Sequence, residues 1–401
     1  MSSHDNCPPG LPSPTGRHPV GRRFYDLTDP DRADPYRRWT SARRKLPVAV
    51  WYPAEAGTGS PARYLPGTWR VLSTAWGLGA SAISPHARDG AVPVDDERFP
   101  LVVFSASANP ALCYSALLED LASHGYVVAG VSHPYESIPI TAYQHGWPAL
   151  MRPRSLGGAL RAPGRRPYEV DRDERAAVVS VKAGDLRFVA DRIAGEAGPL
   201  GLPVDPGRRA AIGHSFGGAA AALVGRDPAW AAVVNLDGGL WLEPADVAVS
   251  TPVLQLFAEH PEYSQPPPDA SRAGDERQDA YAAIDRVTTV GGWQALHEQA
   301  KPGVAAVVRG ATHTSFCDWP LLPLHRWSPA QASLGGRSGP AVWRCVSSAT
   351  RLFLDRWCCG AAVDVDATLG TDRRFFVAPP SSLFPAGGSS RDHDANVPFR
   401  R

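Results

Sequence analysis

The sequence predicts an α/β fold in which a mostly parallel central sheet is covered by helices on both faces. Short apolar runs alternate with amphipathic segments along the chain, which is typical of strands connected by helices. Several runs are apolar at every position, as expected of parallel strands buried on both faces. A long polar interruption between two such runs predicts a cap or lid insertion.

Length and composition predict how the chain is organised. Its 401 residues are enough for one large domain with excursions. Residues 1–18 are polar and rich in proline, so we expect a disordered N-terminal segment. We expect the domain over residues 19–378, a loop or lid insertion at 135–170, and a loosely ordered tail over 379–401.

Charge and motif content exclude several classes of function. A net charge of +1 gives no general attraction to nucleic acid or anionic membranes. The chain has no run of 18 apolar residues and no apolar signal-peptide core, which predicts no membrane span and a cytoplasmic location. These features are compatible with transient contact with a lipid surface, and they do not predict an oligomeric state. The six cysteines lack metal-binding spacing and no nucleotide-binding glycine motif occurs, so we expect no cofactor.

The individual elements follow from the periodicity of apolar residues. Strands are expected at residues 46–52, 99–105, 126–131, 209–214, 231–237, 252–257 and 304–308, the last of which is the final strand along the chain. Helices are expected at residues 64–82, 111–124, 171–194, 217–224, 279–300 and 340–358. Gly125 is placed to end the second of these helices.

The insertion at 135–170 combines glycines and prolines with several arginines. An exposed loop explains this composition. The alternative is a cationic entrance for an anionic substrate head group. The arginines are Arg152, Arg154, Arg161, Arg165 and Arg166.

The motif Gly213-His214-Ser215-Phe216-Gly217 lies between an expected strand and an expected helix of small residues. In this setting a Gly-x-Ser-x-Gly turn presents a nucleophilic serine in a strained backbone conformation, and its glycines let strand and helix approach closely. The bare pattern is weak in a chain with 38 glycines. The assignment of Ser215 as nucleophile therefore depends on its setting and on partners downstream.

Those partners are a base and an orienting acid, without which a serine hydroxyl is a poor nucleophile. In such folds they follow the serine in the order acid, histidine, each after a strand. Asp237 ends the strand after the serine turn, and His313 follows the last expected strand. Glu259, after the next strand, is the alternative acid, and a turn or helix-capping aspartate would look the same as Asp237.

Four other histidines are weaker candidates for the base. His133 precedes the nucleophile, and the side chain of His214 is expected to point away from the serine. His260 and His297 are expected in a loop and on a helix surface.

An oxyanion hole needs two backbone N–H groups aimed at the developing charge. One is expected from Phe216, the residue after the nucleophile. The other is expected from the loop after the strand at 99–105, with Ala106 and Ala108 as the candidates.

Several motifs occur in order: Pro14-Thr-Gly-Arg-His-Pro-Val-Gly21, Leu-Pro-Val-Ala-Val-Trp-Tyr-Pro, Phe-Pro-Leu-Val-Val-Phe-Ser, Asp-Leu-Ala-Ser-His-Gly-Tyr-Val-Val-Ala, Gly-His-Ser-Phe-Gly-Gly-Ala and Asn-Leu-Asp-Gly. Together they resemble the plasma-type platelet-activating-factor acetylhydrolases and their bacterial relatives, from about residue 14 to about residue 320. The resemblance implies an α/β-hydrolase fold and calcium-independent hydrolysis of acyl esters. It also favours Asp237 over Glu259 as the acid.

One segment departs from that family. After Phe-Ser the family has a His-Gly turn, whereas this chain has Ala106-Ser107-Ala108-Asn109-Pro110. The resemblance therefore does not specify the geometry of the oxyanion hole in this chain.

We expect a serine hydrolase that cleaves short-chain or phospholipid-like carboxylic esters, with a small-molecule or lipid substrate. One alternative is an acyltransferase, thioesterase or cyclase of specialised metabolism that uses the same triad. The other is a non-catalytic binding protein on a hydrolase scaffold.

Overall fold

The computed structural model describes residues 11–37, 41–67, 69–70, 77, 83–136, 140–141, 149–150, 166–195, 201–241, 247–264, 276–325, 328 and 339–385. The strands of its main sheet are β1 Val20–Ala33, β2 Arg43–Pro53, β3 Ser60–Pro61, β4 Arg88–Asp89, β5 Phe99–Ser105, β6 Val127–Val131, β9 Val204–His214, β10 Ala232–Leu236, β11 Val253–Phe257, β12 Gly303–Val308 and β13 Phe375–Val377. The helices are α2 Ser115–Ser123, α4 Tyr168–Ala194, α5 Phe216–Val224, α6 Pro261–Ser264, α7 Glu276–Gln299, α8 Gly339–Cys358, α9 Val365–Thr371 and α10 Pro380–Leu383.

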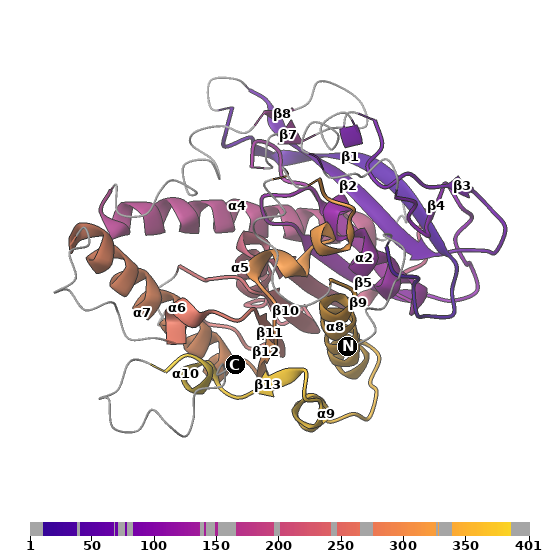
Figure 1. The fold of residues 1–401 in the computed structure, drawn as a ribbon. Helices are drawn as coiled ribbons and strands as arrows, with labels where there is room; N and C mark the ends of the chain where they lie inside the picture. Colours follow the sequence, from indigo (N-terminus) through magenta and orange to yellow (C-terminus); the bar gives the residue numbers. More distant parts are fainter. Residues whose placement is uncertain are drawn as a thin grey trace.

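These strands form one eleven-stranded sheet in the order β13-β12-β11-β10-β9-β5-β6-β2-β1-β4-β3 (Figure 1). The strands from β12 to β6 in this order run parallel to one another. Antiparallel strands flank them, since β2 pairs with β6 and β13 pairs with β12. The carboxyl ends of the parallel strands therefore meet at a single edge of the sheet.

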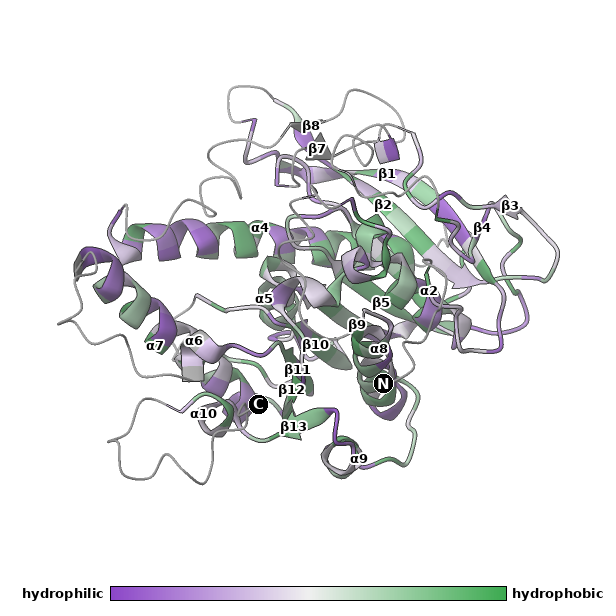
Figure 2. Cartoon of the chain, viewed as in Figure 1, coloured by the Kyte–Doolittle hydropathy of each residue, from purple (hydrophilic) through white to green (hydrophobic). Residues whose placement is uncertain are grey.

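Two hydrophobic cores lie on the two faces of the sheet. In β5, Val102 and Phe104 face one core, and Leu101 and Val103 face the other. Helices α2 and α8 cover the first face, and α4 and α5 cover the second (Figure 1). Figure 2 shows hydrophobic residues along the central strands and hydrophilic residues on much of α4 and α7. The predicted α/β class, with helices on both faces of a mostly parallel sheet, is confirmed.

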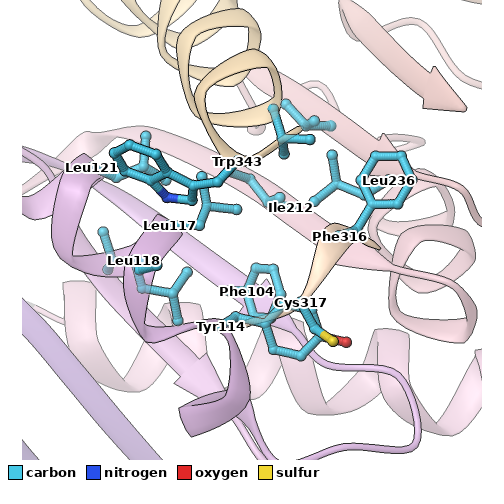
Figure 3. Packing of buried hydrophobic residues seen from close by; sticks show 14 of the residues in the cluster. Phe104, Tyr114, Leu117, Leu118, Leu121, Ile212, Leu236, Phe316, Cys317 and Trp343 are labelled. Carbon is cyan, nitrogen blue, oxygen red and sulfur yellow. The ribbon is translucent and has the colours of Figure 1, made fainter. Parts of the chain in front are cut away.

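The first core shows why α2 and α8 pack together although they are distant in sequence. Trp343 of α8 belongs to the same buried cluster as Leu117 and Leu121 of α2 (Figure 3). Burying side chains of this size contributes about 1.5–3 kcal/mol each relative to leaving them in water. This packing holds the α2 end of the loop after β5 in place.

Every expected strand is present, and the expected helices after residue 110 correspond to α2, α4, α5, α7 and α8. A 3₁₀ turn, Ala111–Tyr114, precedes α2. Gly125 follows that helix with a φ of 92°, a left-handed conformation that suits glycine. Most of the expected helix at 64–82 lies outside the described residues.

The sheet extends further than the sequence predicts. Strand β1, which pairs with β2 over most of its length, was not expected. The prediction that β12 is the last strand of the chain is wrong, because β13 follows α9 and pairs with β12. A strand of three residues is too short to produce a readable pattern.

Both ends of the chain are ordered beyond the predicted domain limits. Leu11 is buried, and the backbone N–H of Thr15 donates to the Asp120 carboxylate at 2.7 Å. At the other end, Phe384 directly follows α10 and is buried, with its ring 5.2 Å from that of Trp293. These contacts differ from the expected disorder for residues 11–18 and the expected loose order for residues 379–385. Residues 1–10 and 386–401 lie outside the described residues, so the prediction for them stays a prediction.

Most of the predicted insertion at 135–170 lies outside the described residues, including Arg152, Arg154, Arg161 and Arg165. Within it, β7 Ile140–Thr141 and β8 Ala149–Leu150 pair as antiparallel strands. Arg166 forms ion pairs with Asp171 at 2.5 Å and Glu174 at 2.8 Å, both at the start of α4. Its charge is therefore neutralised locally, which does not favour a role in a cationic entrance.

Candidate active site

The predicted site residues gather at the carboxyl edge of the parallel strands. Ser215 directly follows β9, and Asp237 directly follows the neighbouring β10. His313 begins a 3₁₀ turn, His313–Phe316, shortly after β12. Because the backbone N–H of Ser215 donates to the Leu236 carbonyl at 2.9 Å, the serine and Asp237 lie side by side at this edge.

Ser215 has the strained backbone expected of a nucleophile turn. Its φ of 57° and ψ of −124° are unusual for a residue with a side chain. The turn is tight, because a Cβ on Gly213 would overlap the Gly217 carbonyl and a Cβ on Gly217 would overlap the Ser105 carbonyl. The two glycines therefore have the role predicted for them, and the turn projects Ser215 beyond the sheet.

Asp237 and His313 are in direct contact. Oδ2 of Asp237 lies 2.7 Å from Nδ1 of His313. An ionised carboxylate can only accept, so Nδ1 carries the proton and Nε2 is left as an acceptor. The aspartate is buried, whereas the histidine side chain is 46% exposed. This is the arrangement of an acid that orients a base.

A second histidine, which the sequence analysis placed in a loop, also binds Asp237. Nε2 of His260 donates to Oδ1 at 2.8 Å, and the Ala258 N–H donates to the same oxygen at 2.9 Å. Burial raises the pKa of Asp237, but His260 and His313 lower it by more, so that it lies well below the usual range. The carboxylate is therefore ionised at neutral pH.

Glu259, the alternative acid, is directed elsewhere. Its Oε1 accepts a hydrogen bond from the Gly310 N–H at 2.7 Å, and its own N–H donates to the Ala311 carbonyl at 3.0 Å. Both contacts are with the loop that leads to His313. Glu259 thus braces the loop that carries the histidine, and Asp237 is the carboxylate that contacts the imidazole.

Comparison with solved structures shows the fold family. The ferulic acid esterase from Streptomyces cinnamoneus superposes with a TM-score of 0.68, at 30% sequence identity. The match covers 89% of this chain and 95% of that one. The chain belongs to the α/β-hydrolase superfamily.

Sequence comparisons relate this α/β-hydrolase to a narrower group. The family described as platelet-activating factor acetylhydrolase, isoform II, matches residues 9–152. The platelet-activating factor acetylhydrolase of Cavia porcellus is 24% identical over 307 residues, which are 70% of this chain and 62% of that protein. A probable 1-alkyl-2-acetylglycerophosphocholine esterase of Arthroderma benhamiae is 27% identical over 253 residues, 58% of this chain and 59% of the relative. The chain spans less than two thirds of these relatives, and the predicted resemblance is confirmed.

The residue before Ser215 also borders the candidate site of this α/β-hydrolase. The ring of His214 lies 4.6 Å from that of His313, and its Nδ1 lies 2.8 Å from the Tyr114 hydroxyl. Burial and then the charge of His313 lower the pKa of His214 to about 3. His214 is thus a neutral, buried ring beside the exposed histidine.

The candidate oxyanion donors differ in accessibility. Phe216 opens α5, where the first N–H groups of a helix have no partner within the helix. Ala106 is fully buried, whereas Ala108 is partly exposed. Of the two donors proposed in the loop after β5, Ala108 is therefore the more accessible.

Among the described residues, no group of three or more His, Cys, Asp or Glu side chains is arranged to hold a metal ion. No helix in the same residues is long and apolar enough to cross a bilayer.

Proposed function

We propose that this α/β-hydrolase is a serine esterase that cleaves carboxylic esters of small-molecule or lipid alcohols. The observation that carries the proposal is the contact between Asp237 and His313 beside the strained Ser215 turn. A buried carboxylate that fixes the Nδ1–H tautomer leaves Nε2 to take a proton from a serine hydroxyl. The named relatives, an acetylhydrolase and two esterases, support the same reaction.

The reaction proceeds in two steps. His313 accepts the Ser215 proton while the serine oxygen bonds to the ester carbonyl carbon, and the alcohol then leaves with that proton. In the second step water gives a proton to His313 as its oxygen bonds to the acyl carbon. The bond between the acyl carbon and the Ser215 oxygen then breaks, Ser215 takes the proton from His313, and the carboxylic acid leaves. Asp237 stabilises the imidazolium in both steps. The N–H groups of Phe216 and Ala108 stabilise the oxyanion.

The substrate class rests on the relatives. The ring of Trp241 stacks on that of Phe216 at 4.6 Å, and the Arg175 guanidinium lies 5.5 Å from the Trp241 ring. Phe216 itself is buried in the core, so only the partly exposed Trp241 of this pair is open to an apolar or aromatic substrate group. Short-chain acyl esters, including acetylated ether phospholipids and ferulate esters, are therefore the substrates to test.

Labelling with a fluorophosphonate tests the nucleophile. The wild-type protein is expected to be labelled, and Ser215→Ala is expected to lose both the label and esterase activity. Asn109→Ala is a suitable control, because it changes a partly exposed side chain in the loop after β5 and leaves the backbone N–H groups there. Persistent activity in Ser215→Ala would rule the proposal out.

A panel of esters tests the reaction class. We expect hydrolysis of p-nitrophenyl acetate and butyrate, with 1-alkyl-2-acetylglycerophosphocholine and methyl ferulate deciding between the two kinds of relative. The same assay with an added amine or alcohol separates hydrolysis from acyl transfer. Product that carries the acyl group on the acceptor in preference to water would favour an acyltransferase. The cytoplasmic location stays a prediction, which fractionation of expressing cells would test.

A further inference from the structure

The loop at residues 106–110 faces the nucleophile turn and lacks the His-Gly turn of the related family. The Gly217 backbone lies against the Ser105 carbonyl, so the loop begins directly beside the turn that carries Ser215. Contacts with other residues must therefore fix the direction of the peptide groups in this loop.

Lys182 of α4 reaches this loop from the interior. Its Nζ donates to the Ala106 carbonyl at 3.2 Å and to the Ser107 carbonyl at 3.3 Å. The same Nζ lies 3.0 Å from the Glu136 carboxylate. The side chain is fully buried, so the ammonium group has exchanged water for these three acceptors. Burying an ammonium group is costly unless its protons are all satisfied, which indicates a specific role for the contacts.

Peptide geometry converts these contacts into a direction for the N–H groups. In a trans peptide the C=O and the following N–H point in opposite directions. Two carbonyls turned toward Lys182 therefore turn the N–H groups of Ser107 and Ala108 away from it. On that side the Ser107 N–H interacts with the Tyr114 hydroxyl, which bonds His214 beside His313. The Ala108 N–H is then the loop donor available to an oxyanion.

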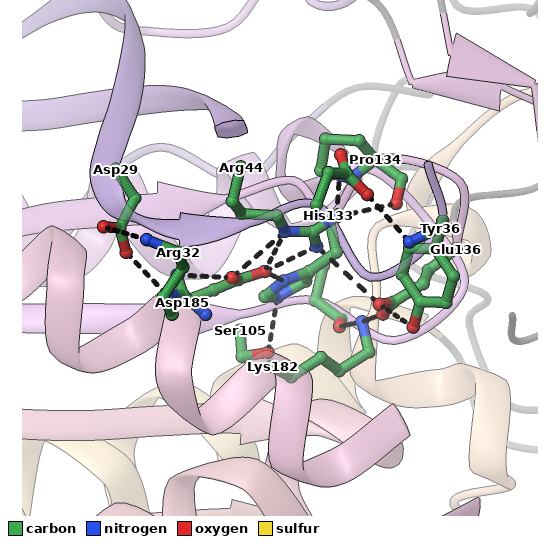
Figure 4. Close-up of polar contacts among 12 residues, drawn as sticks. Asp29, Arg32, Tyr36, Arg44, Ser105, His133, Pro134, Glu136, Lys182 and Asp185 are labelled. Atoms are coloured by element: carbon green, nitrogen blue, oxygen red, sulfur yellow. Dashed lines mark hydrogen bonds and ion pairs between the residues drawn. The ribbon is translucent and has the colours of Figure 1, made fainter. Parts of the chain in front are cut away.

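The ion cluster around Lys182 fixes both the lysine and the start of the loop (Figure 4). Glu136, the anchor of Lys182, also accepts a hydrogen bond from the Tyr36 hydroxyl at 2.7 Å. One turn along α4, Asp185 binds Nδ1 of His133 at 2.9 Å, and Nε2 of that histidine lies 2.9 Å from the Ser105 hydroxyl. The last residue of β5 and the next two carbonyls are thus held by one buried network.

We propose that Lys182 is a positioning residue that orients the Ala108 N–H toward the oxyanion, and that its buried ion pair with Glu136 takes the place of the family's glycine turn. The inference rests on the proposed esterase function. Lys182 has no contact with the substrate in this proposal. It orients the peptide groups that contact the substrate.

The test is a charge-balanced double variant, Lys182→Met with Glu136→Gln, in the full chain. The expected result is a fall in kcat of ~10- to ~100-fold for p-nitrophenyl acetate, with KM within about threefold of wild type. A trifluoromethyl ketone forms a tetrahedral oxyanion adduct with the serine, so its Ki should rise by the same factor as kcat/KM falls. The matched control is Arg22→Met with Asp89→Asn, which removes another ion pair of a fully buried cation, between β1 and β4. It should change neither kcat nor Ki by more than about threefold.

Unchanged kcat and Ki in a double variant that retains its circular dichroism spectrum would overturn the inference. So would a loss carried by KM alone. If the double variant does not fold, Glu136→Gln alone should still lower kcat and raise Ki by ~3- to ~10-fold, because it removes the anchor of Lys182. Wild-type values in that variant would also overturn it. Ser215→Ala distinguishes a failure of the esterase proposal itself. This variant keeps esterase activity only if Ser215 is not the nucleophile.

Discussion

Among the described residues, two Ser-His-Asp sets can be compared, and only one of the two is open to solvent. They are Ser215, His313 and Asp237, the edge set, and Ser105, His133 and Asp185, the interior set. The histidine side chain is 46% exposed in the edge set and 1% exposed in the interior set. In both sets the histidine Nδ1 lies within 2.9 Å of the aspartate. The hydrogen bond between histidine and aspartate alone therefore does not identify a catalytic site.

The difference between the sets lies in the charge that surrounds each aspartate. Asp185 is bound by the guanidinium groups of Arg44 at 2.7 Å and Arg32 at 2.8 Å (Figure 4). Burial and then the nearby Lys182 lower the pKa of His133 to about 4, so this ring stays neutral. Asp237 has only histidines as charged partners among its described contacts. A serine is activated only where its histidine can become charged, which the interior set prevents.

Replacing each serine tests this comparison most directly. Ser215→Ala should lower kcat on the order of 10⁵-fold, because the nucleophile is lost. Ser105→Ala should lower kcat less than about tenfold and stability by about 1–3 kcal/mol, because it leaves a buried histidine nitrogen unpaired. Steady-state kinetics and urea unfolding measure the two effects. Comparable losses of kcat in the two variants would break the comparison.

Replacing each aspartate should give opposite signatures. Asp237→Asn should lower kcat ~10³- to ~10⁴-fold, because the amide favours the wrong tautomer of His313. Asp185→Asn should instead destabilise the fold by about 3–5 kcal/mol, since it leaves Arg44 buried without its main counter-charge. Kinetics and thermal unfolding of both proteins distinguish these outcomes. A catalytic defect in a fully stable Asp185→Asn protein would contradict the distinction.

The pH dependence of stability should report the neutral state of His133. Its folded pKa of about 4 lies below the ordinary 6.5, so the unfolded chain binds more protons between these values. The contribution of His133 to the free energy of unfolding is fully present above pH 6.5. It decreases by about 3 kcal/mol as the pH falls from 6.5 to 4. His133→Gln should remove that part of the slope. Urea unfolding at pH 7 and pH 4.5 measures it, and parallel slopes in the two proteins would refute the expectation.

The smallest expected effect concerns His260, the second donor to Asp237. His260→Ala removes one hydrogen bond of about 1 kcal/mol from the buried carboxylate, so kcat/KM should fall about fivefold. His297→Ala, on α7, is the control histidine. A loss as large as that of Asp237→Asn would show that His260, and not only His313, takes part in proton transfer.

The sequence predicts the parallel core of this fold well because each strand is buried on both faces. The run Phe-Pro-Leu-Val-Val-Phe-Ser corresponds to β5 at both ends. Strand β1 contains arginines and aspartates and reads as polar, yet Arg22 is buried through its ion pair with Asp89. That pairing depends on a residue 67 positions away, which no local pattern contains.

In the candidate site, too, some residues follow from local sequence patterns and others only from packing. Chain order and strand ends predict that Ser215, Asp237 and His313 lie at one edge, and the structure places them there. The contact of His260 with Asp237 was missed because it depends on β10 and β11 being neighbours in register. Lys182 looks like an ordinary polar residue of a long helix. Lys182 is one of three lysines in an arginine-rich chain, which the sequence shows. Its burial depends on packing against the loop after β5, which the sequence does not show.

The backbone of Asp237 limits which residues evolution can place there. Its φ of 56° lies in the left-handed region, where aspartate and asparagine are tolerated far better than longer or branched side chains. Ser215 and Asp237, at adjacent strand ends, thus share a constraint that acts before any chemistry. Glutamate at this position would bear the cost of a left-handed backbone in addition to a longer side chain. The backbone therefore accommodates asparagine, which lacks the negative charge, more easily than glutamate, which keeps it.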